Sequence, residues 1–530
     1  MTAPDEVITG GDIHTLDPSD PSAQALALQH GRVLAAGRDD DILRLAGART
    51  IITHLQGRTV LPGLIDAHLH LQHLALALAR LDCEVPSLAD CLAGVAERAN
   101  VTPAGEWILG HGWNHNTWGA FPDRFALDGV APHHPVYLTA KSLHLGWANS
   151  QALARAGLDR ASPDPIDGQL QRDAQGNLTG ILFEGATNLI TSALPAPSLE
   201  DVVRALASAQ ASLWRLGLTG VHDFDGPMCF AALQTLRERG ELGLRVLKSI
   251  PLDQLDAALE LGLRSGFGDD WIRLGAVKVF ADGALGPRTA AMLDDYAGDP
   301  GNRGTLFQDR ESLFEIGRRA LPAGLALAVH AIGDRANHEV LLAFSALARQ
   351  AYPGAPHMPS RVEHVQLLHP DDVPGLARHN LVASMQPIHA TSDMVMAQRH
   401  WGDRVRTSYA WRSLARVGTR LVFGSDAPVE SPNPFWGLHA AVTRRRQDGS
   451  PGVDGWLPQE RLERQEALLA FTRYPGELAG MAGRQGILRA GSLADLIVLD
   501  GDPLDCAEDE LYELRPCGTM VAGRWRYRDF

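Results

Sequence analysis

The chain has 530 residues, of which 45% are hydrophobic and 21% are charged, the balance of an ordinary soluble globular enzyme. Its formal net charge of −15 argues against a nucleic-acid partner, because the chain has no basic stripe that could neutralise phosphates. Five scattered cysteines without a CxxC pair indicate neither a disulfide framework nor a thiolate zinc site, and the lack of a leader or an 18-residue apolar run predicts a cytoplasmic protein without a membrane span.

The two ends of the chain have the same β-rich character. Residues 1–57 predict short strands and turns, with His30-Gly31 as a hairpin signal between two apolar runs. Residues 485–530 contain similar short runs, in "GSLADLIVLDGDP" and "GTMVAGRWRYRDF". We therefore expect both termini to meet in one small β-sandwich domain, with a larger domain at residues 58–484 between them.

The stretch "LPGLIDAHLHL" opens the larger domain. Leu61–Ile65 is typical of a buried strand, and residues i and i+2 of an extended chain point to the same side. His68 and His70 therefore face one spot. Two imidazoles with a common target suit a metal ion, although a chance pair near the end of a core strand has the same pattern.

Residues 71–199 form a segment that is too long for one crossover between strands. A hairpin that turns at Gln175-Gly176-Asn177 is predicted within it. We interpret this segment as an insertion near the mouth of a barrel.

Apolar β-branched runs alternate with helical stretches through the large domain, the pattern of βα units around a parallel sheet. We expect an α/β fold, a TIM-like (β/α)8 barrel, but ten candidate strands compete for its eight places, and the ambiguity lies in the front half. The candidates are Leu61–Ile65, Trp107–Leu109, Val136–Thr139, Thr219–Phe224, Leu244–Ile250, Ile272–Phe280, Leu325–His330, Arg361–Val365, Leu381–Met385 and Leu421–Phe423.

Polar residues stand at the carboxyl ends of the late candidate strands, where a barrel keeps its active site: Lys278, His330, His364 and Asp426. His364 follows His330 by 34 residues, about one βα unit, and Asp426 follows His364 by 62, about two. A single buried histidine at a strand end is more often a core residue. These four residues together with the earlier histidine pair favour a metal centre.

An ordered series of motifs runs through the chain: "PGLIDAHLH", "HGWNHNTWG", "KVFADGALGPRTAAML", "HAIGDRAN", "EHVQLL", "SMQPIHATSD", "FGSDAPVESPNP" and "GSLADLIVLDGDP". With these motifs the sequence resembles the amidohydrolase superfamily, and more closely its YtcJ-like metal-dependent hydrolases (the amidohydrolase 3 family). The resemblance covers nearly the whole chain. It implies a TIM-like barrel with a metal centre, a β-sandwich formed from both ends, and hydrolysis of amide-like bonds.

By position, the resemblance implies that His68 and His70 hold one divalent ion and that His330 and His364 hold a second. Asp426 would touch the first ion and the nucleophilic water. Zinc is the favoured metal, with one or two ions per chain, and manganese, iron or nickel suit the same ligands. A divalent ion makes a hydroxide nucleophile available near pH 7, and a carboxylate beside it carries the proton to the leaving nitrogen. A helix N-cap is the alternative role for Asp426.

The resemblance also implies that Lys278 is a carboxylated lysine that bridges two ions. Glu184, in "GILFEGA", is the alternative source of a bridging carboxylate. A third interpretation pairs the Lys278 amine with Asp282 and leaves the lysine stem in the barrel wall.

Further residues are predicted to contact the substrate. His389 would hydrogen-bond the substrate carbonyl or the oxyanion formed from it, or be a solvated loop residue. Arg288 would pair with a substrate carboxylate, or make a surface salt bridge. The remaining candidates for the pocket are Trp113, His144 and Asp282, and the alternative role of Asp282 is to cap its own loop. Trp147 and Trp401 are further aromatic residues, and these aromatic candidates either line a pocket or belong to a core.

From these features we predict a metal-dependent amidohydrolase that cleaves a carbon–nitrogen bond of a small molecule, such as an N-substituted formamide, an N-acyl amine or a cyclic amide. One alternative is a mononuclear deaminase of the same superfamily, which has no use for a bridging lysine. The other is a non-catalytic relative that keeps the barrel as an assembly scaffold. The expected partner is a small-molecule substrate, and the expected assembly is a homodimer.

Overall fold

The computed structural model describes residues 3–140, 145–166, 168–350 and 356–530. The chain divides into two compact units, which we call the barrel unit (Met1–Leu74 with Leu206–Phe530) and the insert unit (Ala75–Ala205). The boundaries fall within helices α2 (Leu71–Leu78) and α8 (Leu199–Arg215), close to the ends of the insertion predicted at 71–199.

The barrel unit is built on a sheet of eight parallel strands, in the order β21-β20-β19-β18-β17-β16-β15-β8 over the part of the chain that is described. A bridge between Leu69 and Ala427 brings the two edge strands together. The predicted TIM-like α/β fold is confirmed. The strands are β8 (Leu64–Leu69), β15 (Leu218–Asp223), β16 (Arg245–Pro251), β17 (Ile272–Phe280), β18 (Leu327–Ala331), β19 (Arg361–His364), β20 (Val382–Met385) and β21 (Leu421–Phe423).

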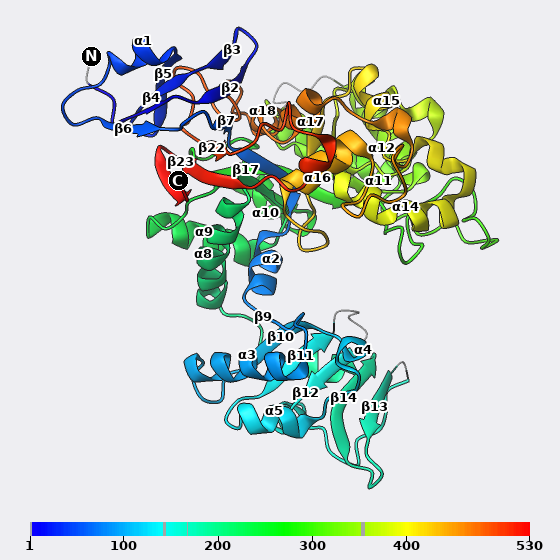
Figure 1. Ribbon diagram of the computed structural model, residues 1–530. Helices are drawn as coiled ribbons and strands as arrows, with labels where there is room; N and C mark the ends of the chain where they lie inside the picture. The colour runs from blue at the N-terminus through cyan, green and yellow to red at the C-terminus, as the bar shows by residue number, and fades with distance from the viewer. Residues whose placement is uncertain (1–2, 141–144, 167, 351–355) are drawn as a thin grey trace. The chain divides into compact units, whose positions relative to one another are not determined.

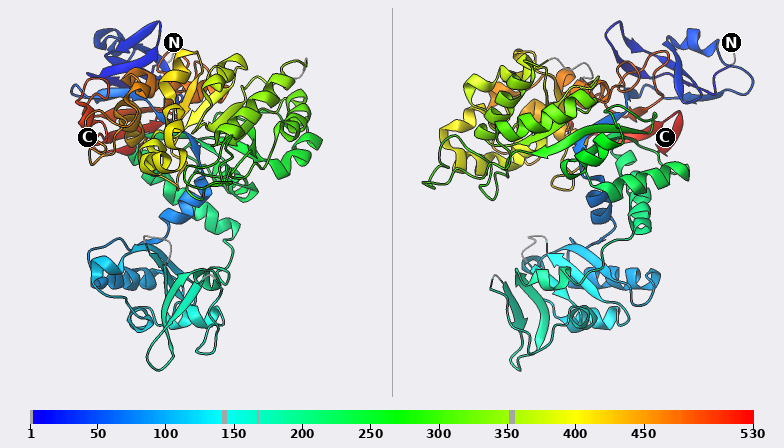
Figure 2. Two further views of the ribbon diagram at one scale, coloured as in Figure 1. Left: turned by 90° about the vertical axis from the view of Figure 1, so that its right-hand side faces the viewer. Right: turned by 180° about the vertical axis from the view of Figure 1, so that it is seen from behind.

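Helices follow most of these strands and lie outside the sheet (Figures 1 and 2). Helix α11 illustrates their design: the Asp309 side chain caps its first turn, and the buried residues Leu313, Gly317 and Ala320 recur at helical spacing. The helices of the barrel are α9 (Pro227–Glu238), α10 (Leu255–Glu260), α11 (Arg310–Ala320), α12 (Asp334–Leu347), α13 (Gly375–Arg378), α14 (Pro387–Trp401), α15 (Trp411–Arg416), α16 (Pro434–Thr443), α17 (Arg464–Ala470) and α18 (Arg473–Leu478).

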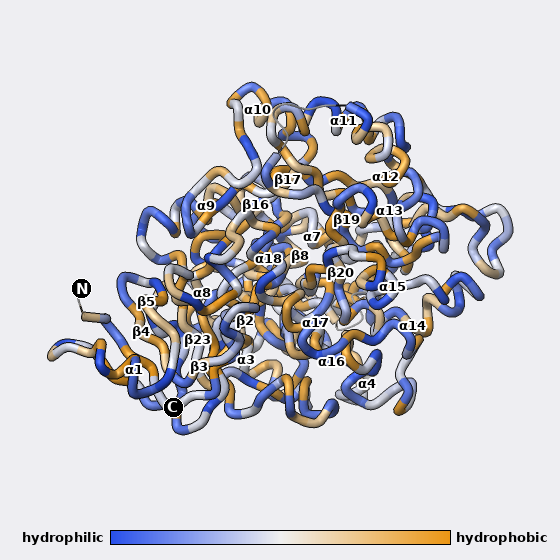
Figure 3. The backbone as a smooth tube through the Cα atoms, turned by 90° about the horizontal axis from the view of Figure 1, so that it is seen from above, coloured by the Kyte–Doolittle hydropathy of each residue, from blue (hydrophilic) through white to orange (hydrophobic). Residues whose placement is uncertain are grey.

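The barrel strands are buried along nearly their whole length. Every residue of β8, β18, β19 and β20 is buried. Figure 3 shows the hydrophobic stretches around the labelled strands and more hydrophilic tube along α11. Parallel strands covered on both faces have this composition, and polar side chains in them therefore call for a specific explanation.

Two of the ten candidate strands do not belong to the barrel. Trp107–Leu109 and Val136–Thr139 correspond to β10 (Ile108–Trp113) and β11 (Val136–Ala140), which pair with each other in the sheet of the insert unit. The other eight candidates mark the eight barrel strands, so the ambiguity of the front half is resolved.

The segment Leu61–Ile65, predicted as one strand, is divided at Gly63. β7 (Thr59–Pro62) pairs with β22 in a terminal sheet, and the first barrel strand, β8, begins only at Leu64. A Cβ atom at Gly63 would lie 2.2 Å from the Thr219 hydroxyl, so only glycine allows this close approach to β15. The consequence is that His68 lies inside β8, whereas His70 follows its end.

Both ends of the chain contribute to one terminal sheet of order β24-β23-β22-β7-β2-β3, and the blue and red segments lie side by side in Figure 1. A second sheet, β5-β4-β1-β6, accompanies it. The remaining bounds are β1 (Glu6–Thr9), β2 (Asp12–Asp17), β3 (Asp20–Ala23), β4 (Ala25–Gln29), β5 (Arg32–Gly37), α1 (Asp39–Leu43), β6 (Ile51–His54), β22 (Leu496–Leu499), β23 (Pro516–Val521) and β24 (Arg524–Arg528).

The insert unit has its own sheet, of order β13-β14-β12-β11-β10-β9, and its own core around Cys91, Trp113 and Trp147. The predicted hairpin is β13 with β14, and Gly176 supplies the positive φ of its turn. The other elements are β9 (Leu81–Asp82), α3 (Leu88–Val101), α4 (His115–Trp118), α5 (Arg124–Val130), β12 (Leu145–Ala148), α6 (Ser150–Arg155), β13 (Gly168–Arg172), β14 (Leu178–Glu184) and α7 (Thr187–Thr191).

None of the helices in the described ranges combines the length and the apolar character that a membrane crossing requires.

Candidate metal centre

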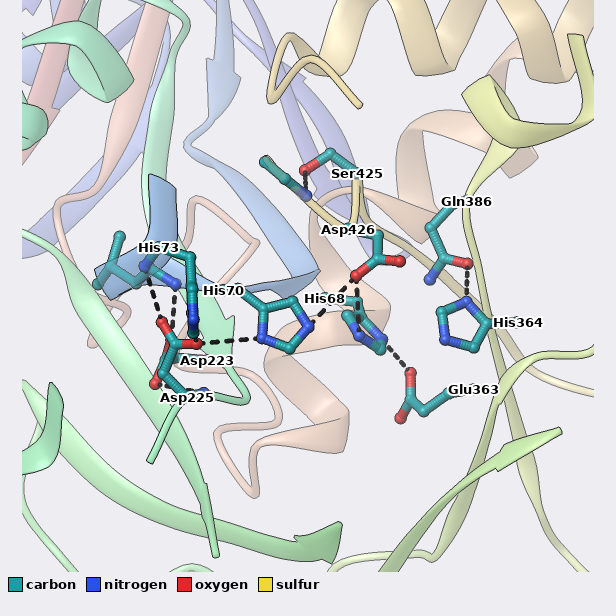
Figure 4. A network of polar contacts seen from close by, with 12 residues as sticks. His68, His70, His73, Asp223, Asp225, Glu363, His364, Gln386, Ser425 and Asp426 are labelled. Atoms are coloured by element: carbon teal, nitrogen blue, oxygen red, sulfur yellow. Dashed lines mark hydrogen bonds and ion pairs between the residues drawn. The ribbon is translucent and has the colours of Figure 1, made fainter. Parts of the chain in front are cut away.

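Three side chains from the first and last barrel strands converge at the carboxyl end of the sheet (Figure 4). His68 is fully buried, whereas the side chain of His70 is 28% exposed. Their Nε2 atoms lie 3.4 and 3.5 Å from Oδ1 of Asp426. The ligand atoms of the three residues all lie within 4.8 Å of one another, so this set fits a single metal ion.

The backbone of Asp426 ties the last strand to the first. Its N–H donates to the carbonyl oxygen of His68 at 2.7 Å, and its φ of +61° is a left-handed conformation in which aspartate is enriched. Helix α16 begins only at Pro434 and is capped by Asn433, so Asp426 is not a helix N-cap. Burial raises the pKa of the Asp426 carboxyl above its usual value.

Two further carboxylates orient the histidine rings. Glu363, fully buried in β19, lies 2.6 Å from Nδ1 of His68, and Asp225 lies 3.1 Å from Nδ1 of His70. A proton on each Nδ1 satisfies these bonds and leaves the Nε2 lone pairs directed at Asp426. Nε2 of His68 is buried and lacks a hydrogen-bond partner among the described residues. A metal ion would satisfy that nitrogen.

An arginine anchors Glu363 inside the barrel. Arg361 forms an ion pair with Glu363, donates to the Ala67 carbonyl at 2.8 Å and donates to Nδ1 of His222 at 2.9 Å. Burial lowers the pKa of His222 well below its usual value, so that ring is neutral and can accept the bond. The carboxylate that orients His68 therefore has a buried counter-charge.

A second group of ligand atoms lies beside the first. Those of His364, His389 and Asp426 also lie within 4.8 Å of one another. His364 ends β19, where its Nδ1 lies 2.8 Å from Oε1 of Gln386 (Figure 4). His389 lies in the first turn of α14, and its buried Nε2 has no hydrogen-bond partner within the described part of the chain. This nitrogen is a second candidate ligand atom.

The resemblance implied that His330 and His364 hold the second ion, whereas the structure brings a ligand atom of His389 close to His364. The His330 and His364 rings are neighbours, with centroids 4.6 Å apart, but Nε2 of His330 lies 2.9 Å from the carbonyl oxygen of Gly283. Burial, helped by the charge of Lys278, lowers the pKa of His330 to about 3, so the ring is neutral at physiological pH. His330 lines the cavity, and its Nε2 is already hydrogen-bonded to the Gly283 carbonyl.

Lys278 is buried near the end of β17. Its Nζ lies 4.4 Å from the centroid of the Phe224 ring and 4.9 Å from that of Phe280. Burial lowers the pKa of the amine to about 8. Its carboxylation, and the alternative of Glu184 as the bridging ligand, remain predictions. Glu184 ends β14 in the insert unit.

Asp282 organises the loop after β17. Its carboxylate accepts hydrogen bonds from the backbone N–H groups of Ala291, Ile332 and Gly333, at 2.8, 3.0 and 2.8 Å. The side chain is 0% exposed. These bonds explain a buried aspartate here without a substrate and without the Lys278 amine, which fits the loop-capping alternative for Asp282.

The other predicted substrate contacts have different surroundings. Arg288 pairs with Asp299 at 2.7 Å and is 44% exposed, the surface salt bridge that was its alternative. Trp113 is 0% exposed within the core of the insert unit, where its Nε1 donates to the Leu138 carbonyl, the position of a core residue. His144 lies outside the described residues. Trp147 and Trp401 are also buried.

A cavity of ≈410 Å³ opens beside the metal-ligand candidates. His68, His70, Lys278, His330, His364, His389 and Asp426 all line it. This volume lies in the range of sites for small molecules, and the chemistry-bearing side chains therefore face a space that a substrate can enter.

Glu363, Asp225 and Arg361 were not predicted from the sequence. A signal was present in "RVEH", where two charged residues stand two apart in a strand that must be buried on both faces. Charged side chains at such positions require partners, and a neighbouring histidine ligand is a natural one.

A family model described as an amidohydrolase family matches residues 52–527. The chain is 32% identical to "Putative amidohydrolase YtcJ" of Bacillus subtilis, over 98% of each chain. It is 30% identical to "N-substituted formamide deformylase" of Arthrobacter pascens, over 99% of this chain and 98% of that protein. Among solved structures, an uncharacterized metal-dependent hydrolase from Pyrococcus furiosus matches with a TM-score of 0.76 and 30% identity, over 94% of this chain and 100% of that one.

Proposed function

We propose that the protein hydrolyses the carbon–nitrogen bond of a small amide. The chain belongs to the amidohydrolase family and resembles metal-dependent hydrolases along nearly its whole length. The observation that carries this proposal is the convergence of the Nε2 atoms of His68 and His70 on one oxygen of Asp426. The buried Nε2 of His68 lacks a partner in the described residues, and the oriented rings suit a metal ion.

His68, His70 and Asp426 would hold a divalent ion, and His364 with His389 would hold a second one next to it. Zinc suits a set of imidazoles and one carboxylate. When bound, such an ion polarises an amide carbonyl and lowers the pKa of a water molecule towards neutrality.

Asp426 is the residue to which we assign proton transfer. It lies at the carboxyl end of the last strand and lines the cavity, so a carboxylate oxygen can take a proton from water and deliver it to the leaving nitrogen. His389 lines the same cavity, and it serves either as a ligand or as a donor to the carbonyl oxygen of the substrate. Its closeness to His364 and Asp426 favours the first role.

The test is hydrolysis by protein that has been stripped of metal and then reloaded with zinc. Formamides and acetamides of simple amines should each release one amine per amide cleaved, and the chelated protein should be inactive. Release of ammonia from aminopurines or aminopyrimidines, without cleavage of the amides, would favour the deaminase alternative. Absence of turnover across the whole panel, with metal bound, would contradict the proposal.

A double variant, His68→Ala with His70→Ala, examines the site itself. It should lose tightly bound metal and all hydrolysis but keep its fold, because the strand pairings and the many buried apolar side chains of the barrel do not depend on these two residues. Full metal occupancy in this variant would move the metal site elsewhere.

A further inference from the structure

Much of the lining of the cavity is apolar. It includes Phe280, Leu285, Ile332, Met396 and Val429. Two of these side chains are open to solvent to an extent that is unusual for large apolar groups, since Phe280 is 49% exposed and Val429 is 68% exposed. An apolar substituent on the substrate would cover them.

Two carboxylates interrupt this apolar wall, Asp393 and Glu430. Asp393 is fixed in place, because the hydroxyl of the buried Tyr409 donates to it at 2.6 Å. With Asp426 at the metal-ligand group, three acidic side chains line the cavity.

Positive charge is scarce in the same cavity. Within the described residues that line it, Lys278 is the one lysine or arginine, and its amine lies against the Phe224 and Phe280 rings beside the metal-ligand group. Arg288, which follows the lining segment 284–287, pairs with Asp299 and is not part of the lining. A carboxylate on the N-substituent of a substrate would therefore meet acidic side chains, with Lys278 as the one lysine or arginine among the described lining residues.

We infer that the cavity selects substrates by charge: the protein takes amides whose N-substituent is uncharged and apolar, and rejects amides whose substituent carries a carboxylate. This inference rests on the proposed function for the site. Its physical cause is like-charge repulsion from Asp393 and Glu430, in a wall whose apolar groups cannot replace the hydration of an anion. N-acyl amines are then substrates, and N-acyl amino acids are not.

The experiment compares two probes that differ in one charge, N-(4-carbamoylbenzyl)formamide and N-(4-carboxybenzyl)formamide. The para group lies across the ring from the amide, so it tests the cavity lining beyond the reacting amide. The zinc-loaded full-length protein should show a kcat/KM for the neutral probe that is at least about tenfold higher than for the anionic probe. The Glu430→Lys variant should reduce this ratio at least about threefold, and Glu430→Gln should lie between. Glu513→Lys makes the same charge change at an exposed position that does not line the cavity, and it should leave the ratio unchanged.

Calorimetric titration of both probes separates this inference from the proposed function. Charge-selective binding without hydrolysis would contradict the proposed function alone. Equal kcat/KM values or equal dissociation constants for the two probes, binding of neither probe, or a ratio that Glu430→Lys and Glu430→Gln leave unchanged would each overturn the charge selection.

Discussion

The two nitrogens of the His68 ring have separate tasks: Nδ1 binds Glu363 and Nε2 faces Asp426. We therefore predict that Glu363→Gln, which can present an amide N–H to Nδ1, lowers metal affinity by about 10- to 100-fold, the usual effect of losing such an orienting group. Competition with a chromophoric chelator measures it. Glu460→Gln, at another buried glutamate, is the matched control.

Glu363→Gln also leaves Arg361 without its counter-charge, so the variant is expected to lose stability. Glu363→Asp separates the two effects, because it keeps the charge but shortens the reach to His68 by one methylene. Its metal affinity should fall, with a smaller loss of stability. Wild-type affinity in both variants would show that Glu363 does not orient the ligand.

The carboxylate of Asp426 is predicted to act as a base. Asp426→Asn keeps the shape of the side chain and removes its basicity, so kcat for amide hydrolysis should fall by ~10² to 10⁴. Metal content must be measured on the same preparation, because Asp426 is also a candidate ligand. Near wild-type turnover in this variant would assign the proton transfer to another group.

Lys278 is the subject of a prediction about the number of metal ions. Reaction of its neutral amine with carbon dioxide would give a carbamate, whose two oxygens can bridge ions about 3.5 to 4 Å apart. Lys278→Ala should then bind one ion fewer than the wild type, and added acetate or propionate should restore the second. Two ions in the variant without added acid would exclude this bridge and favour Glu184.

The residues of the site differ in how far the sequence could predict them. His68 and His70 were predictable because their spacing of two is a local property of a strand. Glu363 and Asp225 act on these histidines from 295 and 155 residues away along the chain, and no local pattern carries such a contact. Tertiary packing likewise decides that Nε2 of His330 is hydrogen-bonded to the Gly283 carbonyl. It also decides that Nε2 of His389 lacks a hydrogen-bond partner among the described residues.

At the scale of elements, periodicity identified all eight barrel strands but could not separate them from equally apolar strands of the insert sheet. β10 and β11 are largely apolar, like barrel strands, although β10 has two partly exposed residues and β11 has one, and their pairing with each other places them in the insert sheet. The division between β7 and β8 was missed for a similar reason, since both are fully buried and Gly63 alone marks the boundary.

The contact at this boundary gives a prediction on stability. Gly63→Ala would place a methyl group 2.2 Å from the Thr219 hydroxyl, so the free energy of unfolding should fall by about 1–3 kcal/mol, as for other overpacked sites. Urea unfolding measures the change. The exchange variant, Gly63→Ala with Thr219→Gly, removes the opposing side chain and should lose less than the sum of the two single variants. Additive losses would mean that the two positions do not clash.

At the scale of the whole molecule, the chain contains two units with separate cores. The insert unit packs around residues such as Trp113 and Trp147, whereas every candidate ligand except Glu184 belongs to the barrel unit. In the described residues, the barrel unit contains three sheets and the insert unit one, and the strand pairings stay inside each unit. Two cooperative unfolding transitions are the expected consequence of this organisation.

Metal removal should therefore affect only one of the two transitions. An ion that binds the folded barrel at about 1,000 times its Kd stabilises that unit by about 4 kcal/mol, and stripping it with a chelator should lower the barrel transition by several degrees. Scanning calorimetry of the full chain, with and without metal, measures the shift, and a fragment of residues 75–205 identifies the transition of the insert unit. That fragment should unfold at the same temperature in both conditions. A barrel transition that the chelator leaves in place, or an insert transition that moves with it, would contradict a metal site built from barrel residues alone.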